Sequence, residues 1–486
     1  MHAKEGEIPL TMWLIISVLA ALILVILIRT LAFRPRSQVK PEPQDVSLDD
    51  NRVAGDMQAM IRMKTVSYQD KSLEDAKAFE EFPKLLKTLY PRLHEKLEQE
   101  HIGDRGLLYR WPGKKSDRPG VLMAHYDVVP VQEATWDKPP FDGIIEDGVL
   151  WGRGTLDTKC TLLGVMEAAE MLISEGFVPE NDLYLAFAGD EEVYGHGAPD
   201  IVAEFKRRNV TPAFVLDEGG AVAENIFPGV SAPCALIGLA EKGIMNASFE
   251  AVSPGGHASM PPPHTAVGIL ARAVTRVENH PFPFTLTEPV KQMFDVLGRR
   301  SIFWYRMIFS NLWCFASLLN LLCKKRGGEM NALVRTTCAF TRMSGSPAHN
   351  VLPPKAAVGA NLRLIGGDTL EGARTRLKRI VKDQRVAVTV TDGNNPTPCS
   401  PAGGEAWDRL AAAVGQTWPE AVIAPYLMVA ATDSRHYATI SSHVYRFSPL
   451  AMTLEERRTI HANNERIPLS KLYDLVRFYV RLIKLL

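Results

Sequence analysis

Three short apolar runs, separated by helical patterns, constrain the fold of the first half of the chain most strongly. They cover residues 120–124, 182–188 and 213–216, and a helical pattern at 161–174 lies between the first two. Strands that alternate with helices predict an α/β fold built on a mixed, largely parallel sheet. Polar residues cluster where each run ends, and ligands of open α/β sheets gather at such carboxyl ends.

The pattern changes after residue 240. Strand-like stretches now outnumber helical ones, in the order βαββαβ, which predicts a smaller α+β, ferredoxin-like domain over residues 241–399. Helix–strand alternation resumes from residue 400. The smaller domain is therefore expected to be inserted into a larger one that comprises residues 51–240 and 400–486.

The N-terminal segment is the most apolar part of the chain. Residues 12–28 carry no charged side chain and one polar one, Ser17. If the apolar run extends to residue 33, it is just long enough to cross a bilayer. We expect residues 1–33 to form one transmembrane helix that anchors the protein in a membrane. A cleaved signal peptide is the alternative, but two acidic residues in the head and the lack of a small-x-small cleavage site disfavour it.

The basic residues that follow the apolar run bear on its orientation. They are Arg29, Arg34, Arg36 and Lys40. By the positive-inside rule they favour a cytoplasmic main body. The side of the membrane stays open until a topology experiment decides it.

Two further segments stand outside the expected domains. Residues 34–50 are polar and contain prolines, so we expect a stiff linker. Residues 297–330 are rich in aromatic and aliphatic side chains, but Arg306, Asn311 and Asn320 disfavour a second membrane span. We expect a partly exposed amphipathic segment that packs on the fold, on the membrane surface or around an apolar substrate.

Composition narrows the classes of function. The 486 residues suit two or three domains, and 55 basic residues balance 55 acidic ones, so no global charge favours nucleic acid. The six cysteines are scattered without a CxxC pair, which disfavours a cysteine zinc site and a disulfide framework.

Acidic and imidazole side chains occur at five separate places along the chain. They are His125 with Asp127, Asp157, the pair Glu191 and Glu192, Asp217, and His461. Each alone fits an ordinary structural role; Asp157, for example, could cap a helix. Together they offer the nitrogen and carboxylate donors that zinc accepts. One histidine and one carboxylate for each of two ions, plus a bridging carboxylate, use five residues and leave one carboxylate as a base.

The order HxD, GRGxxD, EE, DEG and a late histidine resembles that of the dinuclear zinc peptidases and amidohydrolases, which include carnosinases, aminoacylases and carboxypeptidase S. The resemblance covers residues 50–468 and is closest to the branch of carboxypeptidase S and the N-fatty-acyl-amino acid hydrolases. It departs just after Asp157, where the family usually has Asp-x-Lys-Gly and here Asp157 is followed by Thr158, Lys159 and Cys160. The family's cis peptide bond after this aspartate is a feature that the structure can test.

The resemblance implies a role for each motif residue. Two zinc ions, with cobalt or manganese as alternative metals, would be held by His125 and Asp217 on one side, by Glu192 and His461 on the other, and by Asp157 as the bridge. Glu191 would be the general base, and Asp127 would orient His125.

The resemblance also implies how substrate is bound. The small domain would be a lid and dimerisation domain, whose His257 reaches the oxyanion across a homodimer. Arg435 and Asn350 would contact the substrate carboxylate.

The activity implied is hydrolysis of an amide or peptide bond next to a C-terminal carboxylate, as in a carboxypeptidase or dipeptidase. Hydrolysis or synthesis of N-fatty-acyl amino acids is an alternative. A membrane-anchored binding protein on the same fold would have lost ligands, and none of the motif residues is lost.

Overall fold

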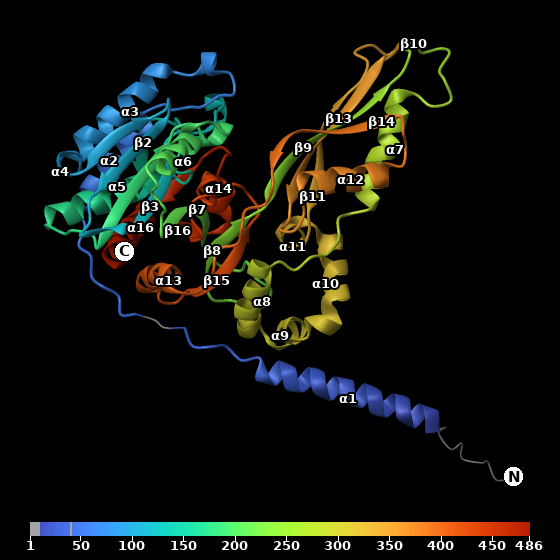
Figure 1. The fold of residues 1–486 in the computed structure, drawn as a ribbon, viewed down its shortest axis with the longest axis horizontal. Helices are drawn as coiled ribbons and strands as arrows, with labels where there is room; N and C mark the ends of the chain where they lie inside the picture. Colours follow the sequence, from blue (N-terminus) through green and yellow to red (C-terminus); the bar gives the residue numbers. More distant parts are fainter. Residues whose placement is uncertain (1–9, 39–40) are drawn as a thin grey trace.

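The computed structural model describes residues 10–38 and 41–486. Within these residues the largest element is an eight-stranded mixed sheet (Figure 1). Its spatial order is β1 (Glu98–Ile102), β2 (Gly106–Trp111), β6 (Asn181–Ala188), β3 (Lys115–His125), β7 (Phe214–Ala223), β16 (Val444–Met452), β8 (Cys234–Glu241) and β15 (Val422–Met428). The pairs β6–β3, β3–β7, β7–β16 and β8–β15 are parallel, so the predicted mixed, largely parallel sheet is confirmed.

Helices cover both faces of this sheet. One layer contains α2 (Asp50–Arg62), α5 (Lys159–Ser174), α13 (Glu405–Thr417) and α16 (Leu469–Leu485), with α3 (Ala76–Leu89) and α4 (Pro91–Lys96) packed beside α2 and α5. The opposite face carries α6 (Gly197–Arg207) and the short α14 (Ser434–Tyr437). Both faces of the central strands are therefore buried, which explains their nearly continuous apolar sequences.

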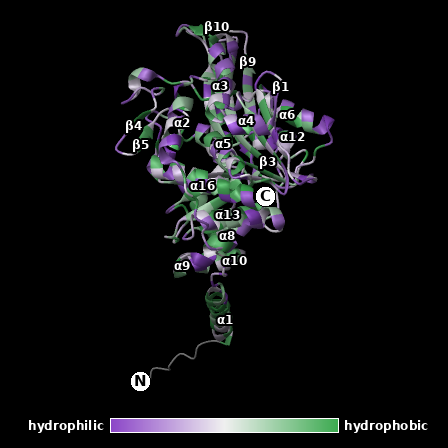
Figure 2. Cartoon of the chain, turned by 90° about the vertical axis from the view of Figure 1, so that its left-hand side faces the viewer, coloured by the Kyte–Doolittle hydropathy of each residue, from purple (hydrophilic) through white to green (hydrophobic). Residues whose placement is uncertain are grey.

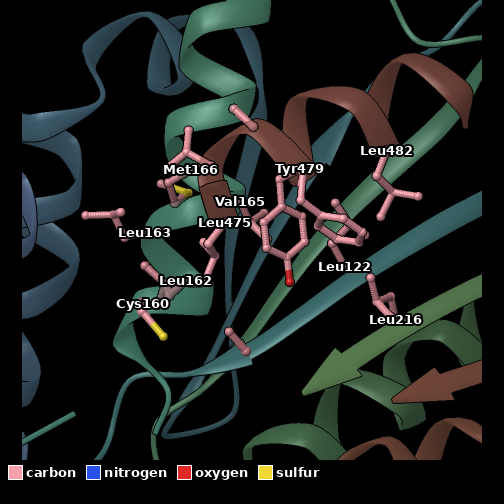
Figure 3. Close-up of a cluster of buried hydrophobic side chains, with 14 of the residues drawn as sticks. Leu122, Cys160, Leu162, Leu163, Val165, Met166, Leu216, Leu475, Tyr479 and Leu482 are labelled. Carbon is pink, nitrogen blue, oxygen red and sulfur yellow. The ribbon is translucent and has the colours of Figure 1, made fainter. Parts of the chain in front are cut away.

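Helix α5 lies at the centre of the main core. It is buried over almost its whole length because apolar side chains surround it on all sides. Figure 3 shows its side chains, Val165 among them, beside Leu475 and Tyr479 of α16. A Cβ on Gly164 would lie 2.0 Å from Leu475 Cδ2, so the two helices approach at a distance that only glycine permits. This packing holds the start of α5 firmly against the sheet.

The third predicted strand is longer than expected. The apolar run at 213–216 becomes β7, which continues through the polar residues after it as far as Ala223. Asp217 and Glu218 therefore lie inside a strand and not in the turn after it. Pairing with β16 on one side extends the strand beyond its apolar part.

A second, antiparallel sheet of four strands stands apart from the large one (Figure 1). Its spatial order is β11 (Thr337–Ser344), β13 (Lys355–Leu364), β9 (Gly243–Val252) and β14 (Val386–Asn394), and α7 (Ala266–Asn279) and α12 (Leu370–Val381) pack on it. The chain follows the expected order βαββαβ. This small sheet begins where β8 ends, and Thr397, on the returning chain, bonds to the backbone of Glu241.

Between α7 and β11 the chain forms α8 (Glu288–Arg300), α9 (Phe303–Ser310), α10 (Leu312–Arg326) and α11 (Gly328–Leu333). The last two turns of α1 (Leu10–Ala32) contact α9. Helix α1 has 23 residues and a mean hydropathy of 2.9, and it is the helix among the described residues that is long and apolar enough to cross a membrane. Figure 2 shows it as a hydrophobic rod that projects from the body. Helices α9 and α10 meet at 111°.

The segment between α1 and α2 follows the surface of the body. The Gln38 side chain donates to the carbonyl of Ile423 at 2.7 Å and accepts from its N–H at 3.3 Å, which caps part of the edge strand β15. Further on, Arg481 donates to the carbonyl of Gln44 at 2.7 Å, and Val46 is buried in the main core. The segment expected to be a linker is thus attached to the body at several points.

Candidate metal centre

The candidate site lies at the carboxyl ends of parallel strands of the large sheet. His125 is the last residue of β3, and Glu191 and Glu192 form a short turn after β6. Asp157 precedes α5 by two residues, and His461 lies in the loop between α15 (Leu454–Arg457) and β17 (Arg466–Pro468). Strand ends of this kind expose polar side chains without breaking the core below them.

Asp157 lies between two histidines. Its Oδ1 is 3.0 Å from His125 Nε2, and its Oδ2 is 3.0 Å from His461 Nε2. Glu192 Oε1 is 3.1 Å from the same nitrogen of His461. The peptide bond from Asp157 to Thr158 is cis, so this feature of the family is retained despite the changed residues that follow. A carboxylate shared by two imidazoles is the arrangement that a bridge between two metal ions needs.

The acidic side chain beside His125 belongs to Glu218 and not to Asp217. Glu218 Oε1 is 3.3 Å from His125 Nε2. Asp217 instead accepts hydrogen bonds from the backbone N–H groups of Ser434 at 2.8 Å and of Glu218 at 2.9 Å. Successive side chains of a strand point to opposite faces, so only one of the two can join the cluster. The structure thus places the Glu218 carboxylate, and not that of Asp217, beside His125.

Most of the cluster is buried or half-buried, the His461 side chain is 51% exposed, and acidic groups outnumber basic ones. Burial raises the pKa of Glu191 well above its usual range and that of Glu218 to about 7. Hydrogen bonds to Asp157 and Glu192 raise the pKa of His461 to about 10. The shift of His461 reflects its acidic neighbours, whereas the shifts of the two glutamates reflect chiefly their burial. Two groups of three residues could each hold a metal ion, because the donor atoms within each group lie within 4.8 Å of one another. The groups are His125–Asp157–Glu192 and His125–Glu191–Glu218, and divalent cations would balance their charge.

Asp127 connects the two halves of this cluster. Its Oδ1 is 3.3 Å from His125 Nδ1 and accepts the N–H of Glu191 at 3.2 Å. Its Oδ2 accepts the N–H of Glu192 at 3.2 Å and the hydroxyl of Ser67 at 2.7 Å. Asp127 is fully buried, so these contacts orient the imidazole and the acidic turn at once. Ser67 was missed at the sequence level, because it lies 60 residues away in no recognisable motif.

Glu465 fixes the loop that carries Asp157, and the sequence analysis missed it. Its carboxylate accepts the N–H groups of Leu156 at 2.6 Å and Asp157 at 3.1 Å and pairs with Arg153 at 2.6 Å. All of its side chain is buried. An acidic residue four positions after His461 is too weak a signal to predict this role.

Arg435 lies beside the acidic turn. Its guanidinium carbon is 5.3 Å from the ring centre of Tyr194, the residue that ends the turn, and its Nη1 donates to the carbonyl of Thr432 at 2.8 Å. Burial raises the pKa of the neighbouring Asp433 to about 8, and the charge of Asp433 acts on Glu191. The predicted carboxylate contact thus lies close to the metal cluster within the same chain.

His257 and Asn350 lie together, away from the cluster. His257 is in β10 (Gly256–His257), which pairs with β12 (Val351–Leu352), and the carbonyl of Asn350 accepts the N–H of Ala258 at 3.0 Å. Figure 1 shows β10 at the far end of the small sheet, remote from the α5 and β7 that carry the metal cluster. Both side chains are exposed. Within one chain they do not reach the other predicted site residues.

Comparison with known proteins identifies the family. The model of peptidase family M20/M25/M40 matches residues 121–485. The chain belongs to this family. It is accordingly a metal-dependent hydrolase, and the family and class of enzyme predicted from the motifs are confirmed.

Two groups of relatives are similar over most of the chain. A probable carboxypeptidase S-like 2 of Dictyostelium discoideum is 32% identical, with 99% of this chain and 95% of that protein covered. The human N-fatty-acyl-amino acid synthase/hydrolase PM20D1 is 33% identical, with 88% and 86% covered. Both names fit the branch that the resemblance indicated.

Solved structures share the fold. The M20 metallo-carboxypeptidase Sso-CP2 of Sulfolobus solfataricus superposes with a TM-score of 0.65 at 15% identity, covering 90% of this chain and 99% of that chain. Human carnosine dipeptidase 1 gives a TM-score of 0.63 at 13% identity, covering 90% and 96%. At these identities the likeness supports the architecture alone.

Proposed function

We propose that this protein is a two-zinc hydrolase that cleaves an amide bond next to a free carboxylate, as a carboxypeptidase or dipeptidase does. The observation that carries the proposal is the Asp157 carboxylate shared by His125 and His461, with one further acidic side chain beside each histidine. His125 and Glu218 would hold one ion, and Glu192 and His461 the other. This nitrogen and oxygen donor set suits zinc, with cobalt or manganese as alternatives.

Two bound divalent ions would polarise the scissile carbonyl and lower the pKa of the attacking water. Glu191 is the residue placed to move protons. It follows Asp190 at the end of β6, it is buried, and its pKa is raised by burial, so its carboxylate can accept a proton from water and pass it to the leaving nitrogen. Asp127 holds Glu191 and His125 in place during this transfer, because its carboxylate accepts the N–H of Glu191 and lies 3.3 Å from His125 Nδ1.

Arg435 is proposed to bind the free carboxylate of the substrate. Its side chain is only 10% exposed, and the guanidinium is held by the carbonyl of Thr432 and the ring of Tyr194. A fixed guanidinium recognises a carboxylate through two parallel hydrogen bonds. His257 and Asn350 would complete the site from the small domain of a second copy in a homodimer, since they lie away from the cluster in their own chain.

An N-fatty-acyl amino acid is the second candidate substrate. Relatives named N-fatty-acyl-amino acid synthase/hydrolase are 32–34% identical over most of the chain, and α9 and α10 expose large apolar side chains. Turnover of dipeptides and of N-oleoyl amino acids by the purified zinc enzyme distinguishes the two. Faster release from dipeptides supports a peptidase, and the opposite ranking supports an acyl amino acid hydrolase.

We also propose that α1 anchors the protein in a membrane by a single pass. Its 23 residues span about 34 Å, enough for the hydrocarbon core. Resistance to alkaline carbonate extraction tests this, and a protein released by that treatment, or one found without α1, would support a cleaved signal sequence instead. Protease protection of intact vesicles decides which side the body occupies.

Glu191→Gln tests the catalytic proposal. The amide cannot accept the proton, so we expect kcat to fall by about 10²–10⁴-fold while zinc content stays near two ions per chain. Elemental analysis and steady-state kinetics on the same preparation measure both. Undiminished turnover would remove Glu191 from the mechanism, and a wild-type protein without bound metal or turnover would point to a binding protein.

A further inference from the structure

Helices α9 and α10 carry an unusual apolar surface. Eight large apolar side chains are exposed there, namely Ile302, Phe303, Trp304, Tyr305, Trp313, Leu318, Leu321 and Leu322. Trp304 is 67% and Trp313 is 58% exposed. Inward-facing residues are few, since α10 buries only Leu319 and Cys323. A contiguous patch of this kind on a soluble surface marks a contact with another molecule or with a membrane.

This surface is joined to the base of α1 by a polar contact. The Asn311 side chain, at the corner between α9 and α10, donates to the carbonyl of Ile26 at 3.3 Å and accepts from Arg29 Nε at 3.1 Å. Arg29 Nη2 donates to the carbonyl of Ser310 at 3.0 Å. Asn311 is fully buried and bonded, so the corner is held at the end of the apolar helix. Figure 1 shows α9 directly beside this end of α1.

The charge of the segment is entirely positive. Residues 297–328 contain six basic residues and no acidic one. Three of the six, Lys324, Lys325 and Arg326, follow one another at the end of α10 and are exposed. Arg29, Lys291 and Arg299 line a hollow of about 530 Å³ together with Phe33, Trp313 and one acidic residue, Asp295, which pairs with Arg299. Basic groups beside exposed tryptophans match the chemistry of an anionic membrane interface.

Neither helix is long enough to span a bilayer. Eight residues of α9 extend about 12 Å and fifteen residues of α10 about 22 Å, against a hydrocarbon core of about 30 Å. The bend of 111° between them also excludes a straight span. Such a pair can lie in the headgroup region with its aromatic side chains in the outer hydrocarbon.

We propose that α9 and α10 insert shallowly into the bilayer that α1 crosses, so that the protein contacts the membrane at two adjoining places. The inference rests on the proposed membrane anchor. The occupant of the apolar surface is the lipid interface, because the surface is continuous with the end of α1 and carries the matching charge. The consequence is a body held at a fixed orientation to the membrane instead of swinging on one helix.

Cys314 offers a direct test, because it is exposed on α10 next to Trp313. In a full-length Cys338→Ser/Cys399→Ser protein it can be labelled with an environment-sensitive fluorophore, the other cysteines being buried. A matched protein with Cys314→Ser and Lys77→Cys carries the label on α3, which lies far from α1 in both views (Figures 1 and 2).

Both proteins are reconstituted in phosphatidylcholine vesicles with phosphatidylserine. We expect the label at Cys314 to be blue-shifted, quenched severalfold more strongly by doxyl lipids than the label on α3, and slower to react with aqueous dithionite. Equal quenching and equal dithionite rates, in protein that resists carbonate extraction, would overturn the inference and leave the anchor intact. Release by carbonate would refute the anchor itself. A disulfide between two Cys314 residues in the unlabelled protein, without a lipid effect on the labelled one, would assign the surface to a second copy.

A charge-reversal triple variant tests the electrostatic part. Lys324→Glu/Lys325→Glu/Arg326→Glu should lose most of the doxyl quenching at Cys314, because anionic lipid then repels the end of α10. Lys77→Glu/Lys84→Glu/Lys87→Glu, on exposed positions of α3, makes the same change in net charge and should leave the quenching at Cys314 unchanged. Equal quenching in both variants would exclude the basic cluster from membrane contact.

Discussion

The metal centre and the far end of the small sheet hold their histidines in opposite ways. His125 is 2% exposed and has Asp127, Asp157 and Glu218 around its ring. His257 is exposed, and its ring bonds to Ser259, two residues away. The candidate metal ligands of the first site come from one chain and are fixed by long-range contacts. The second presents a free imidazole edge, as a group meant for another molecule would.

The difference shows two requirements on a histidine side chain: one must be held in place, and the other must stay accessible to another molecule. A ligand between two metal ions must not move, so buried partners surround it. A group that reaches into the site of a second subunit has to remain uncovered until the subunits meet. Substitutions in one of the two sites at a time test this difference, and their expected effects on turnover decrease in the order Glu218, His257, Asp127 and Ser67.

Glu218→Gln should have the largest effect. Loss of this ligand should lower the zinc content from about two to about one ion per chain and reduce kcat roughly 10³-fold, since one of the two ions supplies several kcal/mol of transition-state stabilisation. Asp217→Asn is the matched control and should keep both ions, because its carboxylate bonds to backbone N–H groups. Elemental analysis of both variants decides between them, and zinc loss in Asp217→Asn alone would restore the assignment from the motif.

His257→Ala should lower kcat by about 10²–10³-fold if its imidazole stabilises the oxyanion. Zinc content should not change, because the residue lies away from the cluster. Co-expression with Glu191→Gln should recover about a quarter of wild-type activity, as half of randomly formed dimers are mixed and one of their two sites is complete. Failure to recover activity in mixed dimers would mean that His257 does not act across the interface.

Asp127→Asn should lower kcat or zinc affinity by about 10–100-fold, the usual loss when the partner of a ligating histidine is changed. The amide keeps some hydrogen bonds but removes the charge beside His125 Nδ1. Asp104→Asn, on the surface and paired with Lys71, is the control and should behave as wild type. Kinetics over a zinc titration separate the two effects, and a variant indistinguishable from wild type would leave Asp127 a purely structural residue.

Ser67→Ala should have a smaller effect on turnover than Asp127→Asn and a clear one on stability. It deletes the 2.7 Å bond to Asp127, and a hydrogen bond to a charged group contributes about 1.5–3 kcal/mol to the free energy of unfolding. Ser259→Ala makes the same deletion beside His257 and should stay within about 0.5 kcal/mol, because the site is exposed. Urea denaturation of the detergent-solubilised chain measures both, and equal losses would contradict the contrast drawn between the two regions.

The features that could be predicted from the sequence are those that a local pattern of residues determines. Hydrophobic periodicity located three of the eight strands of the large sheet (β3, β6 and β7), the βαββαβ order and the apolar helix α1, because each depends on neighbours within a few residues. The order of acidic and imidazole groups indicated the family, because these groups follow strand ends that share one edge of the sheet. His125, Asp157, Glu192 and His461 were predicted to meet, and the structure brings them within hydrogen-bonding distance of one another.

Only the tertiary structure could decide the rest. Asp217 and Glu218 are adjacent in one motif, and the choice between them depends on which face of β7 each side chain takes. Ser67 and Glu465 act through contacts 60 and more than 300 residues away along the chain, which no local pattern records. The junction of α1 with α9 likewise joins segments about 280 residues apart. The sequence by itself determined the chemistry that this chain can hold; the packing of distant segments decided which atoms hold it.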